Sequence, residues 1–252
     1  MTTPILSVPV RGKGRHYRWP GTDTFVPSVT NVLSILDKPA LPRWASSETA
    51  KAAAAIKHDL AGMDDDEIVS HLKGAPWRKS EKASERGTTI HQWLENAMLG
   101  KELPELDGEA ADYEQAADRW LHDMQPTPVR LEVTMFATDY AGTADGVVEI
   151  DGSRWLIDFK TSKGLYESAA LQVAALAACP MWSSEDFESA EPCPPVDRVA
   201  AVRIGADGDY EMLEVIDLAG LQAAFRSCLE VWKWKYEGAK PFGPKFERTR
   251  DE

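Results

Sequence analysis

Cysteine, long apolar runs and positive charge are all scarce in this sequence, and each shortage excludes a class of protein. The 252 residues include only three cysteines, Cys179, Cys193 and Cys228, which are widely spaced and odd in number. Such cysteines form neither a disulfide framework nor a CxxC metal site, so we expect reduced and mostly buried thiols. No run approaches the roughly 18 apolar residues that span a bilayer, which predicts that the protein has no membrane partner.

The start of the chain also lacks the order of a secretory signal. In MTTPILSVPVRGKGR the basic residues follow a short apolar patch, whereas a signal places them before a long one. We therefore expect a cytoplasmic protein. No pattern in the sequence predicts its oligomeric state.

Positive charge is scarce overall, because Asp and Glu outnumber Lys and Arg by 41 to 28 and the net charge is −13. This balance counts against a nucleic-acid partner, whose phosphates are bound by Lys and Arg. The basic residues are concentrated, however. Residues 1–43 carry six basic side chains against two acidic ones, and residues 73–86 carry five against two. A nucleic-acid partner therefore stays open.

Apolar periodicity and turn residues predict the order of helices and strands. We expect short strands or an extended arm at residues 4–26, then a short helix that Ser28 or Thr30 caps and that ends before Pro39. Further helices are predicted at 43–60, 82–98, 112–124, 166–178 and 218–236, and another is capped by acidic residues 64–67 and runs through Leu72. Strands are predicted at 129–136, 143–150, 153–160, 198–204 and 209–215, with a loop at 180–196.

This order predicts an α/β fold in which helices flank a mixed β-sheet, with an N-terminal helical addition. A hydrophobic content of 43% and a charged content of 27% suit a single folded domain over residues 1–252. Within it we expect the N-terminal arm and helical addition at 1–80, the core at 81–237 and a tail at 238–252.

The segment GTADGVVEIDGSRWLIDFKTSK, residues 142–163, carries the chemistry. Asp158 and Lys160 are two apart on a predicted strand and project from the same face, while Phe159 points to the opposite face, toward the core. Asp151-Gly152 predicts a hairpin turn almost midway between Asp145 and Asp158. The two carboxylates can therefore lie across from each other, within reach of one divalent cation.

Oxygen ligands of this kind suit Mg²⁺ or Mn²⁺. Such an ion lowers the pKa of a bound water, polarises a phosphate and stabilises charge on the leaving oxygen. Lys160 beside it would position or help deprotonate the attacking water and offset charge on the phosphate. Taken alone, a D-x-K pair on a strand is far more often a surface ion pair.

Six blocks follow one another in the order of a known family: PSVTNVL at 27–33, RGTTIHQWLE at 86–95, Glu132 in RLEVTMF, GTAD at 142–145, DFKTS at 158–162 and Tyr166 to Gln172. Together they resemble the PD-(D/E)xK nuclease superfamily, particularly its RecB-like and Cas4-like exonuclease branch, common in phages and in mitochondrial genome maintenance. Any one block is weak evidence, whereas six in order are strong. The resemblance implies a restriction-endonuclease-like core and a phage-type protein of DNA recombination or repair.

The resemblance also implies roles for individual residues. Asp145 and Asp158 would be metal ligands together with His91 and the backbone carbonyl of Phe159. Lys160 would be the catalytic lysine. Glu132 would hold a second metal or a bound water, or else form an edge-strand ion pair, and both alternatives stay open.

Other residues would contact the nucleic acid or the lysine. Gln172 would contact the scissile phosphate or orient Lys160. Arg86 would contact DNA or cap a helix start, and Thr161, Ser162 and Lys163 would donate to phosphate or simply end the strand. Three tryptophans near basic residues, Trp19, Trp44 and Trp77, are candidates for stacking on unpaired bases.

One departure from the family is the absence of the four cysteines that hold an iron–sulfur cluster in several relatives, so we expect no such cluster. The leading hypothesis is a Mg²⁺- or Mn²⁺-dependent DNA exonuclease acting on single strands or duplex ends. Alternatives are a structure-specific endonuclease or nickase with the same site, and a catalytically silent nucleic-acid-binding module. A calcium protein is a further alternative, but it would have no use for Lys160 and the chain lacks an EF-hand loop.

Overall fold

A seven-stranded mixed sheet forms the centre of the protein. The computed structural model describes residues 6–238 and 241. Its strand order is β10-β9-β6-β5-β4-β7-β8, and every pair is antiparallel except β6 with β9. The strands are β4 (Thr127–Phe136), β5 (Ala141–Ile150), β6 (Ser153–Lys160), β7 (Met181–Ser183), β8 (Ala190–Pro192), β9 (Arg198–Ile204) and β10 (Tyr210–Glu214). The predicted mixed sheet is therefore confirmed.

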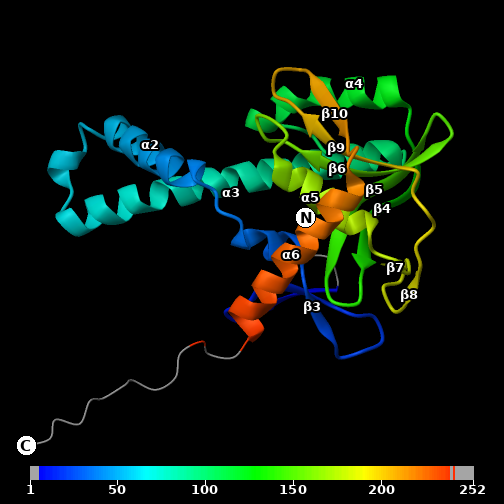
Figure 1. Cartoon of the computed structure of the whole chain (residues 1–252). Helices are drawn as coiled ribbons and strands as arrows, with labels where there is room; N and C mark the ends of the chain where they lie inside the picture. The colour runs from blue at the N-terminus through cyan, green and yellow to red at the C-terminus, as the bar shows by residue number, and fades with distance from the viewer. Residues whose placement is uncertain (1–5, 239–240, 242–252) are drawn as a thin grey trace, which may run out of the picture.

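Helices cover both faces of this sheet (Figure 1). On one face α5 (Glu167–Ala177) and α6 (Leu218–Glu237) bury Leu176 and Trp232 against strand residues such as Leu156. On the other face the end of α3 (Asp65–Met98), the 3₁₀ helix η3 (Gly108–Tyr113) and α4 (Glu114–Met124) pack on the sheet. There the fully buried Trp120 meets Phe159 edge-on at 4.9 Å. Alternate side chains along β6 thus pack into two separate hydrophobic cores, one on each face of the sheet. The predicted α/β fold with flanking helices is confirmed.

A small three-stranded sheet lies below the main body, as predicted for the start of the chain. It consists of β1 (Ser7–Val10), β2 (Gly14–Arg18) and β3 (Phe25–Pro27). Residues 4 and 5 of the predicted arm, and most of the predicted tail at 238–252, lie outside the described residues. A short helix α1 (Val29–Val32) and the 3₁₀ helix η1 (Leu33–Ile35) follow, and Ser28 caps α1 as expected by accepting from the amide of Asn31.

A helical arm projects from the body (Figure 1). It is formed by α2 (Ala40–Ala55), the short η2 (Leu60–Gly62) and the outer part of α3. Asp64 and Glu67 form a reciprocal capping box at the start of α3, which confirms that the acidic run is a helix cap. No described helix is long and apolar enough to cross a membrane.

The prediction of two helices between residues 64 and 98 is wrong, because α3 is continuous over 34 residues with Pro76 inside it. A proline removes one backbone donor and usually breaks a helix. Near this interruption the guanidinium of Arg78 donates to the carbonyl of His71 at 2.8 Å. The helix also packs along α2. Packing along α2 therefore supports the helix across Pro76.

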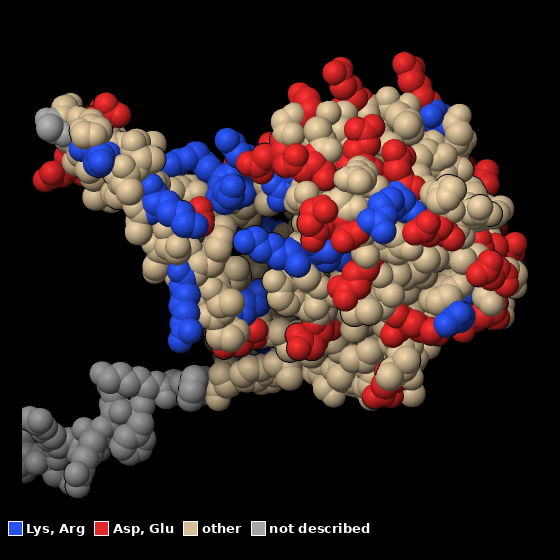
Figure 2. All heavy atoms as spheres, turned by 90° about the horizontal axis from the view of Figure 1, so that it is seen from above, with Lys and Arg blue, Asp and Glu red and all other residues tan. Residues whose placement is uncertain are grey.

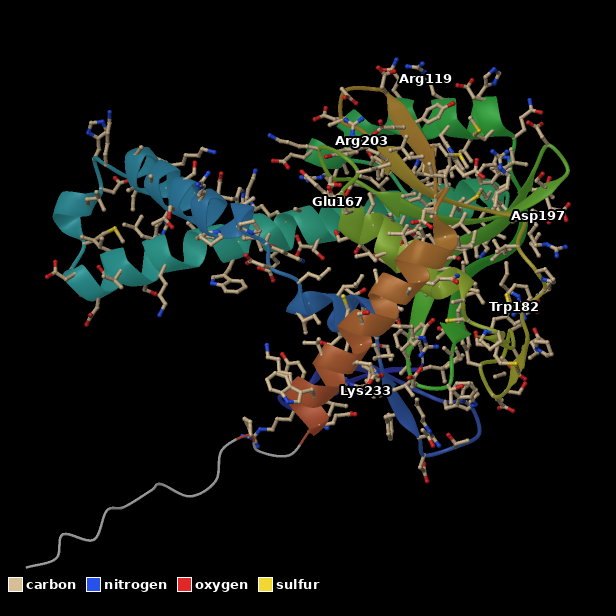
Figure 3. All side chains as sticks on the ribbon, viewed as in Figure 1. Arg119, Glu167, Trp182, Asp197, Arg203 and Lys233 are labelled. Atoms are coloured by element: carbon tan, nitrogen blue, oxygen red, sulfur yellow. The ribbon has the colours of Figure 1, made fainter. Side chains whose placement is uncertain are left out.

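The segment 180–196 is likewise not a plain loop, because β7 and β8 form a hairpin at the edge of the sheet. Arg130 of β4 stabilises this hairpin by donating to the carbonyl of Ser183 at 3.0 Å and to Glu191 at 2.8 Å. The same guanidinium lies 4.8 Å over the ring of Trp182, which is labelled in Figure 3. A strand of three residues shows too little alternation of polar and apolar side chains to be predicted from sequence. The pair of β7 and β8 also depends on Arg130, which lies more than 50 positions from Ser183.

Candidate active site

Three carboxylates lie side by side on three neighbouring strands. The register Gly146↔Ile157 between β5 and β6, continued by one residue, sets Asp145 opposite Asp158. The register Leu131↔Gly146 and Val133↔Ala144 on the other side sets Glu132 beside Asp145. The hairpin at Asp151-Gly152 therefore aligns Asp145 with Asp158 as predicted, and β4 adds Glu132 to the row.

Glycines allow the elements around this row to approach closely. A Cβ on Gly142 would lie 2.8 Å from Leu176 of α5 and 3.2 Å from Val29 of α1, so the glycine admits both helices against β5. On α3, a Cβ on Gly87 would lie 3.2 Å from the hydroxyl of Thr161, just beyond β6. This contact brings α3 against the end of β6. His91, one helical turn further along, then lies over the carboxylates.

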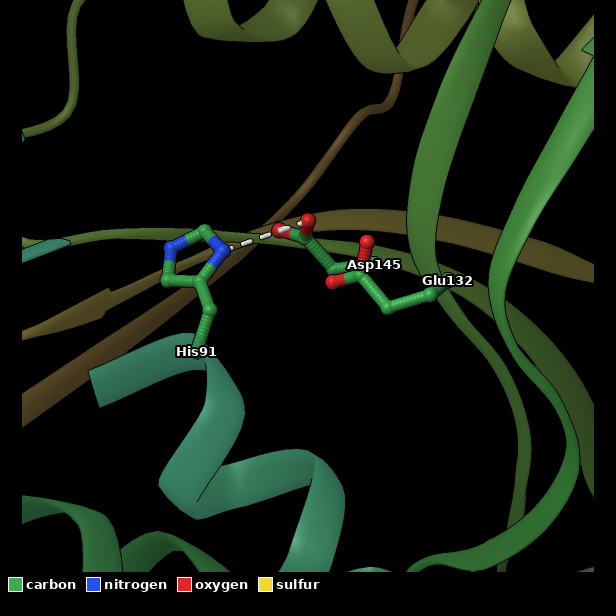
Figure 4. A group of neighbouring side chains, drawn as sticks. All are labelled: His91, Glu132 and Asp145. Atoms are coloured by element: carbon green, nitrogen blue, oxygen red, sulfur yellow. Dashed lines mark ion pairs between the residues drawn. The ribbon is translucent and has the colours of Figure 1, made fainter. Parts of the chain in front are cut away.

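His91, Glu132 and Asp145 form a compact group, shown in Figure 4. One ligand atom from each lies within 4.8 Å of the others. Nδ1 of His91 is 3.3 Å from Oδ1 of Asp145, yet it is buried and makes no hydrogen bond to any described residue. The lone pairs of this nitrogen and this oxygen therefore face each other unless a proton or a cation lies between them. This arrangement fits a divalent ion with nitrogen and oxygen ligands.

Asp158 lies in the same pocket but has other partners. Its side chain is almost fully buried, at 1% exposure. Lys160 forms an ion pair with Oδ2, and Nε2 of Gln172 on α5 donates to Oδ1 at 2.9 Å. Gln172 therefore holds the carboxylate of Asp158, which in turn pairs with Lys160. Asp158 does not belong to the compact group, and its ligation of a metal stays a prediction.

The ring and the backbone of Phe159 make contacts on opposite sides of the sheet, as the strand pattern indicates. Its ring is buried in the core on the far face of the sheet. Its backbone N–H donates to Oδ2 of Asp145 at 2.5 Å, which fixes that carboxylate in front of β6. The amide of Phe159 thus contacts a site residue, and ligation of a metal by its carbonyl stays a prediction.

The pKa values of the carboxylates are shifted in different directions. Burial raises the pKa of Asp158 to about 6, against the opposing charge of Lys160. Burial also acts on Asp145, but the charge of His91, its contact with that ring and the charge of Lys160 outweigh it and lower the pKa. Burial opposes protonation of Lys160 and His91, yet the acidic neighbours prevail and both pKa values are raised. Lys160 therefore remains a cation at neutral pH.

Glu132 is the most perturbed member of the row. Burial, together with the charge of Asp145, raises its pKa to about 8. The carboxylate accepts no hydrogen bond from the described part of the chain, so nothing there replaces the water it lost. Its backbone has φ +46° in the middle of β4, a left-handed conformation that costs a non-glycine residue about 1–3 kcal/mol. Strain and desolvation at one acidic residue are typical of a functional site.

The pocket has a second wall that the sequence did not predict. Besides the residues above, it is lined by residues of the small sheet and of α1, among them Arg15, Tyr17, Ser28 and Thr30. The hydroxyl of Tyr17 hydrogen-bonds that of Thr143 on β5 at 2.9 Å, across 126 positions in sequence. The PSVTNVL block pointed to this region, but no local pattern shows where it packs.

Several predicted nucleic-acid contacts lie outside the pocket. Arg86 is in the interior of α3, so it does not cap a helix start; it pairs with Glu109 at 2.6 Å and lies over the ring of Tyr113. Thr161, Ser162 and Lys163 follow β6 but do not line the pocket.

The three candidate tryptophans differ in exposure. Trp77 on α3 is 76% exposed and Trp44 on α2 is 36% exposed, so both remain candidates for stacking. Trp19 packs against Phe136 at a ring distance of 5.0 Å in the core below the sheet, and its proposed stacking on bases is not favoured by this position.

Comparison with known proteins adds no relative: no protein-family model matches the chain, and no curated protein matches it. The resemblance to PD-(D/E)xK nucleases therefore stays a prediction that rests on the residues of the chain.

Proposed function

We propose that this protein is a Mg²⁺- or Mn²⁺-dependent deoxyribonuclease that acts as an exonuclease. The observation that carries the proposal is the meeting of five side chains in one pocket: His91, Glu132, Asp145, Asp158 and Lys160. Three of them are acidic and buried or half-buried, and the Lys and Arg side chains that line the pocket with them are Lys160 and Arg15. Such an excess of negative charge in a recess is costly unless a cation compensates it.

The residues divide the chemistry between them. His91, Asp145 and Glu132 would hold the ion, and a bound ion supplies a water of lowered pKa and a Lewis acid for the phosphate. Lys160, whose pKa is raised by its acidic neighbours, would stabilise negative charge on the phosphate. Gln172 and Lys160 hold Asp158 in place from two sides. The partial burial of these side chains strengthens each of these interactions.

The distribution of basic side chains supports a nucleic-acid substrate despite the net charge of −13. Figure 2 shows Lys and Arg gathered on the arm and in the recess between the arm and the body, whereas Asp and Glu crowd the body. The exposed basic residues of the arm include Arg43, Lys51, Lys73, Arg78, Lys79 and Lys82. Phosphates bind such clusters by releasing counterions.

End-labelled single- and double-stranded DNA, incubated with Mg²⁺, Mn²⁺ or EDTA, tests the proposal. We expect metal-dependent degradation that Lys160→Ala slows by about 10²- to 10³-fold, since it removes one electrostatic stabiliser. Asp158→Asn should lose activity while keeping its melting temperature. Asp118→Asn, an exposed carboxylate on α4, is the matched control and should cleave like the wild type.

A closed circular substrate distinguishes the two cleavage modes. An exonuclease degrades the linear form and spares the circle, whereas cleavage of the circle would establish an endonuclease or nickase instead. DNA binding without cleavage under either metal would overturn the nuclease proposal in favour of a silent binding module.

A further inference from the structure

Arg15 lies on the wall of the pocket opposite Lys160's strand, and the alternation of β2 directs it there. His16 is buried beneath the small sheet, so Arg15 and Tyr17 share the other face. Tyr17 reaches the hydroxyl of Thr143, which shares a strand face with Asp145. Arg15, two positions before Tyr17, therefore faces the acidic row and lines the same pocket.

The backbone of Arg15 is held firmly relative to β5. Its carbonyl accepts from the amide of Ser28 at 3.0 Å and from the side chain of Asn31 at 3.3 Å. Ser28 in turn forms a parallel bridge with Ala141 at the start of β5. These bonds fix the position of Arg15 relative to β5, which is what a residue that positions a substrate requires.

No ion pair among the described residues gives the side chain of Arg15 a structural role. It is exposed, and within residues 6–238 no carboxylate pairs with it. By contrast, Arg18 on the same strand pairs with Asp23 at 3.3 Å. Arg15 and Lys160 are the two cations that line the pocket, and Lys160 is already engaged by Asp158.

We propose that Arg15 binds a phosphate of the DNA backbone next to the one that is cleaved, and so positions the strand in the site. A planar guanidinium matches two phosphate oxygens at once, which a lysine cannot do. The inference rests on the proposed nuclease function, because that function supplies the phosphodiester chain.

Binding of a fluorescent single-stranded oligonucleotide tests this proposal. It is measured by anisotropy with Mg²⁺ on a Lys160→Ala background, in which the DNA is degraded far more slowly. We expect Arg15→Gln to weaken binding by about 10- to 100-fold. The slope of log affinity against log salt should fall by about 0.7, the contribution of one phosphate contact on a single strand. Arg15→Lys should recover only part of the affinity.

Arg11→Gln is the matched control, because Arg11 is an exposed arginine in the turn before β2 that does not line the pocket. It should leave affinity and salt slope unchanged. Equal affinities for Arg15→Gln and Arg11→Gln would overturn the role of Arg15.

The outcomes separate the two proposals. If the wild type cleaves and Arg15→Gln cleaves with unchanged KM, only the role of Arg15 fails. If the wild type binds without cleaving and Arg15→Gln still weakens binding, only the nuclease proposal fails. If the wild type neither binds nor cleaves DNA, both fail.

Discussion

Replacing Glu132 by glutamine is expected to stabilise the metal-free protein at alkaline pH while impairing metal binding. The pKa of Glu132 is about 8 in the folded protein, against an ordinary value of 4.5. Between these two pH values the folded protein keeps a proton that the unfolded chain has released. Rising pH therefore favours unfolding from about 4.5 upward, and the full cost is present above about 8.

The size of this cost follows from the shift. At about 1.36 kcal/mol per pKa unit, the rise from 4.5 to about 8 corresponds to about 5 kcal/mol. His91 lies beside Glu132 and relieves part of it when it takes up a proton. We therefore expect about 2–5 kcal/mol between the two limits of pH. The strained backbone at Glu132 is common to both proteins and cancels in the comparison.

Urea unfolding in EDTA at pH 5.5 and pH 8.5 measures the effect. The free energy of unfolding of the wild type should fall over this range by more than that of Glu132→Gln. Glu211→Gln, which removes an exposed carboxylate on β10, should follow the wild type. Adding Mg²⁺ at pH 8.5 should restore most of the loss in the wild type and little in Glu132→Gln. Parallel pH profiles for wild type and Glu132→Gln in EDTA would refute the reasoning.

Two further predictions concern the same region. Mg²⁺ at about 100 times its dissociation constant should stabilise the wild type by about 2.7 kcal/mol, which raises its melting temperature by several degrees. Asp145→Asn should lose this rise. An equal rise in both proteins would exclude Asp145 as a ligand. Gly142→Ala should lower the free energy of unfolding by about 1–3 kcal/mol, because its Cβ would lie 2.8 Å from Leu176 and 3.2 Å from Val29. Thermal melting measures this loss, and an unchanged melting temperature would mean that α1 and α5 move away freely.

Local patterns were enough to predict the centre of the site. The hairpin turn at Asp151-Gly152, the two-residue spacing of Asp158 and Lys160, and the core-facing Phe159 all follow from the period of a strand. Each of these features depends on residues a few positions apart. The positions of Asp145 and Asp158 opposite each other are therefore confirmed, as is the capping of α3 by its acidic run.

Other features of the site depend on contacts between distant segments. The left-handed backbone of Glu132 lies within a strand that looks ordinary in sequence, and it arises where β4 meets β5. Gln172 was expected to contact the scissile phosphate or to orient Lys160, and both roles stay predictions. It donates to Asp158, the ion-pair partner of Lys160, because α5 packs on β6.

The sequence by itself determined which side chains share a strand face and where most helices and strands lie, because these depend on backbone periodicity and on local turns. Only the tertiary structure decided that α3 runs through Pro76, that β7 and β8 pair, and that Arg15 lines the acidic pocket. The reason is physical: local periodicity reports which side of an element is buried, whereas the identity of its partner depends on packing between surfaces far apart in the chain.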